Sequence, residues 1–383
     1  MTRVSTQCAY PCQQKGDKTT IMKLYAPKYY PTFKCIGGEC PKSCCIGWEI
    51  VIDDGTLSRY RKMGGELGEM VRKSIINEGG YPHFRLCEGG RCPHLREDNL
   101  CRIICECTEE MLSDICREHP RVYNLSPSFC EVGVGLACPV AADLILGSHD
   151  HSLCEVGDTD DEVTKEYEKE YELYRLFFDT VCHMAVSSSL RGLIIYTDYH
   201  TSHTLPDLLF ELSIHPAARL DVDRAYILGK AITLDEPNDI DGEIKSTLGI
   251  LSSFEVLDDG YGEELVAAWK HLLADMEHAA EYIADNAEKV IRLCEYFLYR
   301  HLHGGVEDGS VSARTRFAII SAFSIMAMSL YHGGSDKIRD CAVDYSRNIE
   351  YSDSNVDTFI DLVDGDEVFG IGFIINLLTN GEK

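Results

Sequence analysis

Apolar side chains recur at helical spacing through most of the second half of the chain. Tyr167, Tyr171, Tyr174 and Phe178 follow one another at intervals of three and four residues, which places them on one face of a helix. A tyrosine stripe of this kind belongs to a core more often than to a binding cage. Similar patterns predict further helices over residues 219–230, 263–284, 287–303, 311–332, 335–348 and 355–378.

The first half of the chain consists of shorter segments that Gly and Pro interrupt. Residues 46–52 are rich in β-branched side chains and predict a short strand or extended segment. Thr56 is the N-cap expected for the helix that follows, and residues 69–77 resume this helix after a glycine pair. Thr108 predicts the start of another short helix, which Pro120 ends.

These patterns divide the chain into four parts. Residues 1–23 are polar and lack periodicity, so we expect a disordered leader. Residues 24–147 form a cysteine-rich, loop-rich module, and acidic side chains dominate residues 148–165, which predicts an acidic linker. Residues 166–383 form the helical domain. The expected fold is therefore mainly α, with a cysteine-rich, metal-binding module packed on an all-α domain.

Charge and hydropathy narrow the class of protein. The 383 residues include 36 Lys and Arg against 63 Asp and Glu, a formal charge of −27. This balance argues against nucleic-acid binding, which needs a basic face. Solubility is the simplest reason for it, and it also permits attraction of a cationic partner such as a lysine-bearing surface. The N-terminus has no apolar stretch typical of a secretory signal, and the apolar run over residues 368–378 is too short to span a bilayer. We therefore expect a cytoplasmic protein without a membrane partner.

The cysteines are concentrated near the N-terminus. Fifteen of the 18 lie before residue 155. In a reducing cytosol, clustered cysteines bind metals or undergo redox chemistry more often than they form disulfides. Thiolates are soft ligands that suit zinc and iron–sulfur clusters, and their spacing alone does not choose between the two.

One loop brings four cysteines close together in sequence: Cys35, Cys40, Cys44 and Cys45. Short spacing lets several sulfur atoms converge on one centre at a small cost in chain entropy. Because Cys44 and Cys45 are adjacent, we expect their side chains to diverge, and at least one of them to serve a different role or centre from its neighbour.

The cysteine framework resembles a known family. Cys40-x3-Cys44-Cys45, Cys92-x2-Leu95, Cys101-x-Ile103 and Cys116-Arg117 resemble an eight-cysteine zinc- or iron-chelating module. Further motifs narrow the resemblance to the flagellin lysine-N-methylase family, the FliB-like proteins of bacteria: Tyr29-Tyr30-x2-Phe33-x-Cys35, Cys44-Cys45-x-Gly47-Trp48-x-Ile50 and Leu136-x-Cys138-Pro139. The resemblance is strong over residues 24–147 and thin in the helical half.

The resemblance implies transfer of methyl groups from S-adenosylmethionine to lysines of flagellin or a similar surface protein, and a [4Fe–4S] cluster as cofactor. This chain departs from the family where Val140 follows Pro139 in place of the usual Glu, and it carries Cys105 and Cys107 as additions. These departures leave the substrate open.

The expected metal ligands are the eight framework cysteines: Cys35, Cys40, Cys44, Cys45, Cys92, Cys101, Cys116 and Cys138. Only four of them need bind a metal, the others then being packed or reactive thiols. His94 and His119, which lie within the motif, are ligands, donors to a cluster sulfur, or packed side chains.

Weaker candidates come from position alone. Tyr30 and Asp53 are candidate bases, since methylation needs a neutral lysine amine. Trp48 and Tyr30 are candidates for an alkylammonium pocket, or cover a buried centre. Arg117 and Arg121 are candidate cofactor-binding residues that would neutralise a cluster or bind a carboxylate.

Two other readings remain open. A zinc ion could merely fold the module in a non-catalytic protein, or the thiols could serve redox chemistry or metal storage. The Gly-x-Gly of residues 133–135 lacks the βαβ surroundings of a Rossmann-type nucleotide site.

Overall fold

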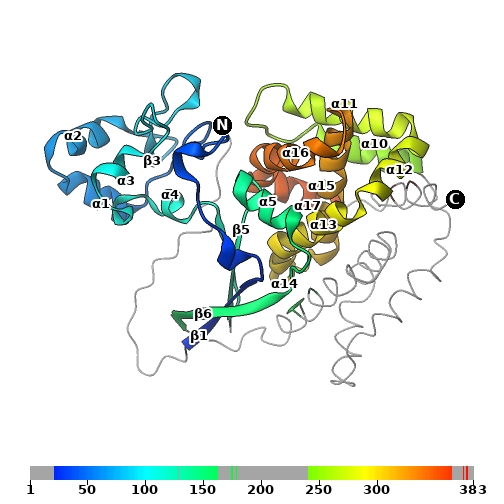
Figure 1. Cartoon of the computed structure of the whole chain (residues 1–383), viewed down its shortest axis with the longest axis horizontal. Helices are drawn as coiled ribbons and strands as arrows, with labels where there is room; N and C mark the ends of the chain where they lie inside the picture. The colour runs from blue at the N-terminus through cyan, green and yellow to red at the C-terminus, as the bar shows by residue number, and fades with distance from the viewer. Residues whose placement is uncertain are drawn as a thin grey trace.

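The computed structural model describes residues 21–127, 129–162, 174, 175, 178, 240–364, 374 and 377. Figure 1 shows the cysteine-rich segment, with helices α1 to α4, on one side and a bundle of helices, α10 to α17, on the other. Strand β5 passes between them. The described chain is mainly helical, as expected, but it also contains sheet that the sequence patterns did not predict.

Helix α15 (Val311–Tyr331) is the centre of the helical half. It is long and apolar enough to cross a membrane, but 83% of its apolar stretch is buried inside the protein. Its buried serines are satisfied by aromatic side chains of the surrounding helices, as when Trp269 Nε1 donates to Ser324 Oγ at 2.9 Å. The surrounding segments are α10 (Ile240–Leu251), α11 (Tyr261–Ala274), α12 (Met276–Asp285), α13 (Ala287–His301), α14 (Gly305–Asp308), α16 (Ile338–Tyr345), the π-helix η7 (Ser346–Glu350) and α17 (Asp353–Asp364).

Most of the predicted helices in this half are confirmed. The pattern over residues 263–284 is two helices, because the chain breaks at Asp275, whose side chain caps α12. Helix α10 was not predicted, and the pattern over residues 219–230 lies outside the described residues. Tyr174 and Phe178 of the aromatic stripe are buried in the core, as expected, while the stripe's other two positions are outside the described part.

A four-stranded sheet has the order β4-β5-β1-β6. Strand β1 (Ile21–Pro27) pairs in parallel with β5 (Phe129–Val134), and the pairs β1–β6 and β4–β5 are antiparallel. Strand β4 covers Arg121–Leu125 and β6 covers Leu153–Glu162. The sheet therefore joins segments from both ends of the predicted cysteine-rich module.

The predicted acidic linker over residues 148–165 was wrong, because most of it is strand β6. Its acids are compatible with an edge strand, where charged side chains face solvent. Glu155 and Asp158 pair with Lys23 of β1 at 2.7 and 2.9 Å. Strand β1 also begins at Ile21, three residues inside the predicted leader, and residues 1–20 are outside the described part.

The predicted module over residues 24–147 does not have a single core. A small core is built by α1 (Asp54–Lys62), α2 (Gly65–Ser74), the hairpin of β2 (Ile75–Glu78) and β3 (Tyr81–Phe84), α3 (Arg102–Glu106) and α4 (Asp114–Glu118). Val122 and Val134 of the sheet, and Ile145 of α5 (Pro139–Gly147), belong instead to the core of the helical half. The cysteine-rich core is thus an insertion between strands β1 and β4.

Two local predictions in this insertion need correction. Helix α1 is capped by Asp53, whose side chain accepts from the Thr56 amide, so Thr56 lies inside the helix. The helix predicted over residues 69–77 ends at Ser74, and Ile75 begins a strand of the hairpin. Gly79 and Gly80, both with positive φ, allow the tight turn between the two strands.

Candidate metal centre

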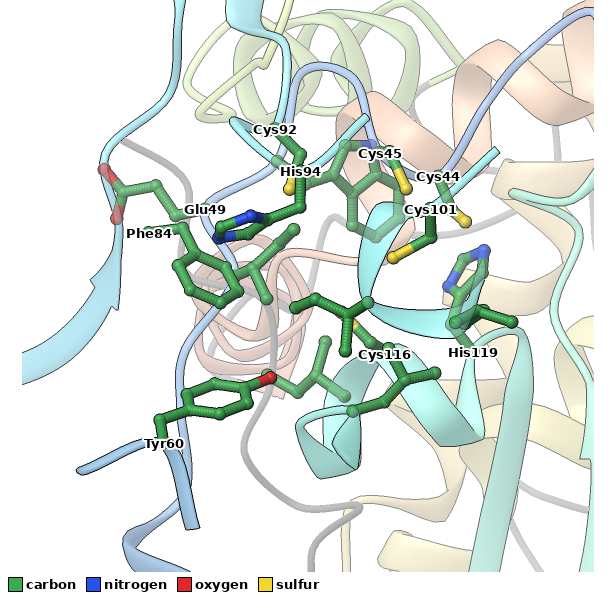
Figure 2. A pocket seen from close by; sticks show the side chains of 16 residues that line it. Cys44, Cys45, Glu49, Tyr60, Phe84, Cys92, His94, Cys101, Cys116 and His119 are labelled. Carbon is green, nitrogen blue, oxygen red and sulfur yellow. The ribbon is translucent and has the colours of Figure 1, made fainter. Parts of the chain in front are cut away.

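A cavity of about 100 Å³ lies inside the cysteine-rich core (Figure 2). Thiols and apolar side chains form most of its wall, which is the combination that suits a buried soft-metal centre. Its lining residues are Cys44, Cys45, Trp48, Glu49, Ile50, Tyr60, Phe84, Cys92, His94, Cys101, Ile103, Ile104, Leu112, Ile115, Cys116 and His119.

Backbone pairing between distant loops brings these thiols together. The Cys92 amide donates to Cys45 O at 2.8 Å, and the Gly47 amide donates to Gly90 O at 2.8 Å. The two glycines approach so closely that a Cβ on Gly90 would lie 3.2 Å from the Gly47 backbone. A bridge between Leu95 and Cys101 closes the second cysteine loop. Helix α4 supplies Cys116.

The eight framework cysteines fall into two groups. Five line the cavity, and Figure 2 shows them around it with His94 and His119: Cys44, Cys45, Cys92, Cys101 and Cys116. The other three, Cys35, Cys40 and Cys138, are not lining residues but lie near enough to one another to interact electrostatically. Cys40 also interacts with Cys44, which links the groups.

The adjacent cysteines do not diverge into separate sites. Cys44 and Cys45 both line the cavity, and their side chains are hydrogen bonded to each other. The chain turns at these two residues, where the Ile46 amide donates to Ser43 O at 3.2 Å. Both thiols therefore lie at one cavity rather than at two separate ones.

The environment raises the pKa, and so favours the neutral thiol, at four of the cavity cysteines: Cys44, Cys92, Cys101 and Cys116. Burial raises the pKa of Cys92 and of Cys116 to about 12. The pKa of Cys44 is raised mainly by its hydrogen bond with Cys45, and then by burial. Backbone amides have the opposite effect and lower the thiol pKa. The His94 amide bonds to the Cys92 sulfur, and the Ile104 and Ile103 amides bond to the Cys101 sulfur. Amide donors at sulfur are what a thiolate would need once a cation displaced the proton.

The cavity is lined by thiols and an imidazole of the kinds that bind soft metals, but these groups are not arranged in coordination geometry. Among the described residues, no three His, Cys, Asp or Glu side chains are spaced to hold a metal ion as they stand. Three lining residues each have a buried polar atom without a hydrogen-bond partner in the described structure: Trp48 Nε1, Tyr60 Oη and His94 Nδ1. A polar occupant of the cavity would give these atoms the partners that they lack.

The tautomer of His94 follows from its partner. Ser74 Oγ donates its one hydrogen to Val71 O at 2.7 Å, so it accepts from His94 Nε2, 3.0 Å away. This leaves Nδ1 with a bare lone pair, and burial lowers the pKa of the ring to about 4, so that it is neutral. His94 is therefore prepared as an acceptor or ligand. His119 instead packs edge-on against Trp48, with ring centroids 5.5 Å apart.

The weaker sequence candidates lie away from this cavity, except Trp48, which is in its wall. Tyr30 Oη accepts from Arg121 Nε at 3.2 Å, and Arg117 pairs with Asp114 and Glu118. Asp53 caps α1 and also accepts from the Asp114 amide at 3.0 Å. Burial favours the neutral acid of Asp53, but its hydrogen bonds with Thr56 and the Asp114 amide outweigh this and lower its pKa. None of these four residues lines the cavity.

Sequence reasoning missed three residues around this centre. Tyr60 sits on the buried face of α1, a position that the helix pattern could have revealed. Arg347 and Tyr351 come from the helical half, about three hundred positions along the chain, and lie against Trp48. No sequence signal connects these two residues to the cysteine loop.

Comparisons with known proteins support the resemblance seen in the motifs. The chain is 29% identical over 130 residues to the flagellar biosynthetic protein FliU of Salmonella muenchen. This match covers 32% of this chain and 77% of FliU. It is equally similar to the lysine-N-methylases of Salmonella typhimurium and Salmonella choleraesuis, but there the match spans only 32% of each relative's length. No protein-family model and no solved structure matches the chain.

Proposed function

We propose that this chain, which belongs with the FliB-like proteins by sequence, is a protein-lysine N-methyltransferase. The names of its relatives support a lysine methyltransferase, and the single structural observation that carries the proposal is the cavity with five thiols. The match spans only about a third of the length of each lysine-N-methylase.

The cavity thiols would hold a [4Fe–4S] cluster, with zinc as the alternative. The chemistry of the donors supports this, because Cys44, Cys92, Cys101 and Cys116 can supply four soft thiolates. A bound cluster would supply thiolate-ligated iron, a redox-active and Lewis-acidic centre. His94 Nδ1 and the donors of Trp48 and Tyr60 would bond to the occupant.

Methyl transfer from S-adenosylmethionine defines what the protein must do. The lysine nitrogen forms a bond to the methyl carbon, the carbon–sulfur bond breaks, and S-adenosylhomocysteine leaves with the electron pair. The ammonium proton must leave first, because only the neutral amine has a lone pair. Apolar surroundings disfavour the charged ammonium and so lower the pKa of a lysine, which lets its proton pass to solvent water before the methyl group is transferred.

We infer that the substrate is flagellin or a similar lysine-bearing protein in the cytoplasm. The name of FliU links one relative to flagella. The formal charge of −27 supports attraction of a lysine-rich surface, with an effect on the association rate that salt would screen. S-adenosylmethionine is the methyl donor in this proposal.

The test is methylation by anaerobically purified full-length protein. Flagellin and S-adenosylmethionine are incubated with it, and lysine methylation is measured by peptide mass spectrometry. We expect methylation that is lost in the combined variant Cys44→Ala, Cys101→Ala and Cys116→Ala. The matched control is the combined variant Cys87→Ala and Cys105→Ala, since these two exposed cysteines lie off the cavity. Equal methylation by both combined variants would contradict a role for the thiol cavity.

A non-catalytic metal protein is the second candidate. The observation that favours it is that the cavity lies within the small core of the cysteine-rich insertion, where a metal could simply stabilise the fold. Metal analysis of the same preparation separates the two. Iron with acid-labile sulfide supports the first candidate, whereas stoichiometric zinc without methylation supports the second.

A further inference from the structure

The helical half places a cation directly on the first cysteine loop. Arg347 of η7 donates from Nη2 to Ile46 O at 2.8 Å, one residue after the Cys44–Cys45 pair. Its guanidinium carbon lies 5.0 Å from the centre of the Trp48 ring, close enough for a cation–π contact. A second contact joins the same cysteine loop to α16, since Lys42 pairs with Asp344 at 2.6 Å.

Arg347 forms no direct ion pair with a carboxylate among the described residues, and Asp258 and Asp344 interact with it only at longer range. Its Nη1 atom is buried without a hydrogen-bond partner in the described structure. The titratable groups that interact with it across the loops are Asp258, Asp344, Cys44 and Cys40. Arg347 is partly buried, and a negative charge beside its unsatisfied Nη1 atom would therefore be favourable.

The local backbone is adapted to this arginine. A Cβ on Gly47 would lie 3.3 Å from Arg347 Nη2, and Gly47 has a φ of 89°, so a side chain there would be both strained and crowded. The position of η7 is fixed from the other side. Tyr296 Oη donates to the buried Glu350 carboxylate at 2.7 Å, which holds the last turn of η7 in the helical core. π-helical turns of this kind occur frequently at functional sites.

We propose that Arg347 is the charge partner of an anionic metal–thiolate centre at Cys44, and that this pairing couples loading of the centre to docking of the helical half on the first cysteine loop. The inference rests on the metal centre of the proposed function but not on the identity of the methyl acceptor. A divalent metal with four thiolates carries net negative charge, and Arg347 contacts the loop of Cys44 from the far half of the chain, at Ile46 O. Arg347 is thus a positioning residue rather than a catalytic one.

The experiment compares wild type with Arg347→Gln and Arg347→Lys in the full-length protein. Gln removes the charge, whereas Lys keeps a charge and a donor in the same position, so the two variants together test the charge. Metal-free protein is titrated with zinc against a chromophoric chelator. We expect Arg347→Gln to bind zinc about ten- to a hundredfold more weakly, as is typical for loss of an outer-shell partner, and Arg347→Lys to retain most of the affinity. Arg314→Gln is the control, because it removes a cation of the same half that pairs with Asp308.

Two further readouts do not depend on activity. Samples reconstituted with iron and sulfide are titrated for reduction potential, which should fall in Arg347→Gln because a positive charge favours the reduced centre. Hydrogen exchange should show that metal loading protects both residues 44–48 and residues 346–350 in wild type, but only residues 44–48 in Arg347→Gln. Wild type that binds neither zinc nor iron would overturn the metal centre itself. Wild type that loads metal, with Arg347→Gln matching it in affinity, potential and exchange, would overturn the pairing alone.

Discussion

Trp48 and Tyr351 meet edge-to-face across the junction of the two cores, with ring centroids 5.0 Å apart and an interplanar angle of 69°. Trp48 lines the thiol cavity, and Tyr351 directly follows η7 in the helical half. The fit around Tyr351 is tight, since a Cβ on Gly135 would lie 2.1 Å from its hydroxyl oxygen. This aromatic pair therefore links the wall of the candidate centre to the helical core.

The pair predicts measurable coupling. Trp48→Ala should lower the free energy of unfolding by about 3–5 kcal/mol, because a nearly fully buried indole is lost. A double-mutant cycle with Tyr351→Ala should give a coupling energy of about 0.5–1.5 kcal/mol, the range for favourable aromatic pairs. Denaturant unfolding of the four proteins measures it.

The control is a second cycle that pairs Trp48 with Tyr331 of α15 instead of Tyr351. The Tyr331 side chain is large and 45% exposed. Trp48→Ala and Tyr331→Ala should be additive, because the two residues share no contact in the described structure. A coupling energy for the Trp48–Tyr351 pair no larger than that of this control would contradict the link.

Asp53 is predicted to act on stability rather than catalysis. Its two oxygen atoms accept from the Thr56 amide at 2.7 Å and from the Asp114 amide at 3.0 Å. Asp53→Ala should therefore cost about 1–2 kcal/mol of stability as a lost helix cap, and Asp53→Asn should cost less. Thermal unfolding measures this. Both variants should methylate at the wild-type rate once corrected for the folded fraction, and a loss of rate in folded Asp53→Asn would restore Asp53 as a candidate base.

The helical half was predictable because its elements are long and their apolar positions repeat. Helices α13 and α15 match the predicted ranges to within about two residues. The sheet was missed for physical reasons. Strand β5 is buried along its whole length, so it shows no alternation of apolar and polar residues, and strand β6 carries the acids of a solvated edge.

Of the candidate site, only the cysteines could be predicted from the sequence. Spacing identified the cysteines, but not that five share one cavity while Cys35, Cys40 and Cys138 lie beside it. Arg347 depends on a contact with Ile46 across 301 positions, which only tertiary packing creates. Asp53, in contrast, was predicted to be a candidate base because of its position near the cysteines in the sequence, but in the structure it caps α1.

The two groups of cysteines predict different effects on metal binding. Cys92→Ser with Cys116→Ser should abolish stoichiometric binding of iron or zinc, because both thiols line the cavity. Cys35→Ser with Cys138→Ser should leave the stoichiometry unchanged, since four of the cavity thiols suffice for a four-coordinate metal. Metal analysis of anaerobically purified proteins measures this. Equal loss in both double variants would show instead that the ligand set extends beyond the cavity.

Glu131 should make stability depend on pH. Its carboxyl is buried in β5, where Asn124 and Tyr174 each donate to Oε2 at 3.3 Å and Oε1 has no hydrogen-bond partner among the described residues. Burial raises the pKa of Glu131 from 4.5 to about 7, despite the opposing effects of Asn124 and Arg175. The folded protein therefore binds a proton that the unfolded chain releases between these two values.

The sign of the effect follows from this difference. Between about pH 4.5 and pH 7 the folded state holds more protons at Glu131 than the unfolded state, so this group lowers stability as the pH rises. Glu131→Gln removes the penalty, and its stability relative to wild type should increase across this window by up to about 3 kcal/mol. Urea unfolding at a series of pH values measures the difference. The control, Glu155→Gln, removes an exposed acid of the same sheet and should show no such gain. A constant difference between Glu131→Gln and wild type from about pH 5 to pH 8 would mean that Glu131 is ionised in the folded protein throughout.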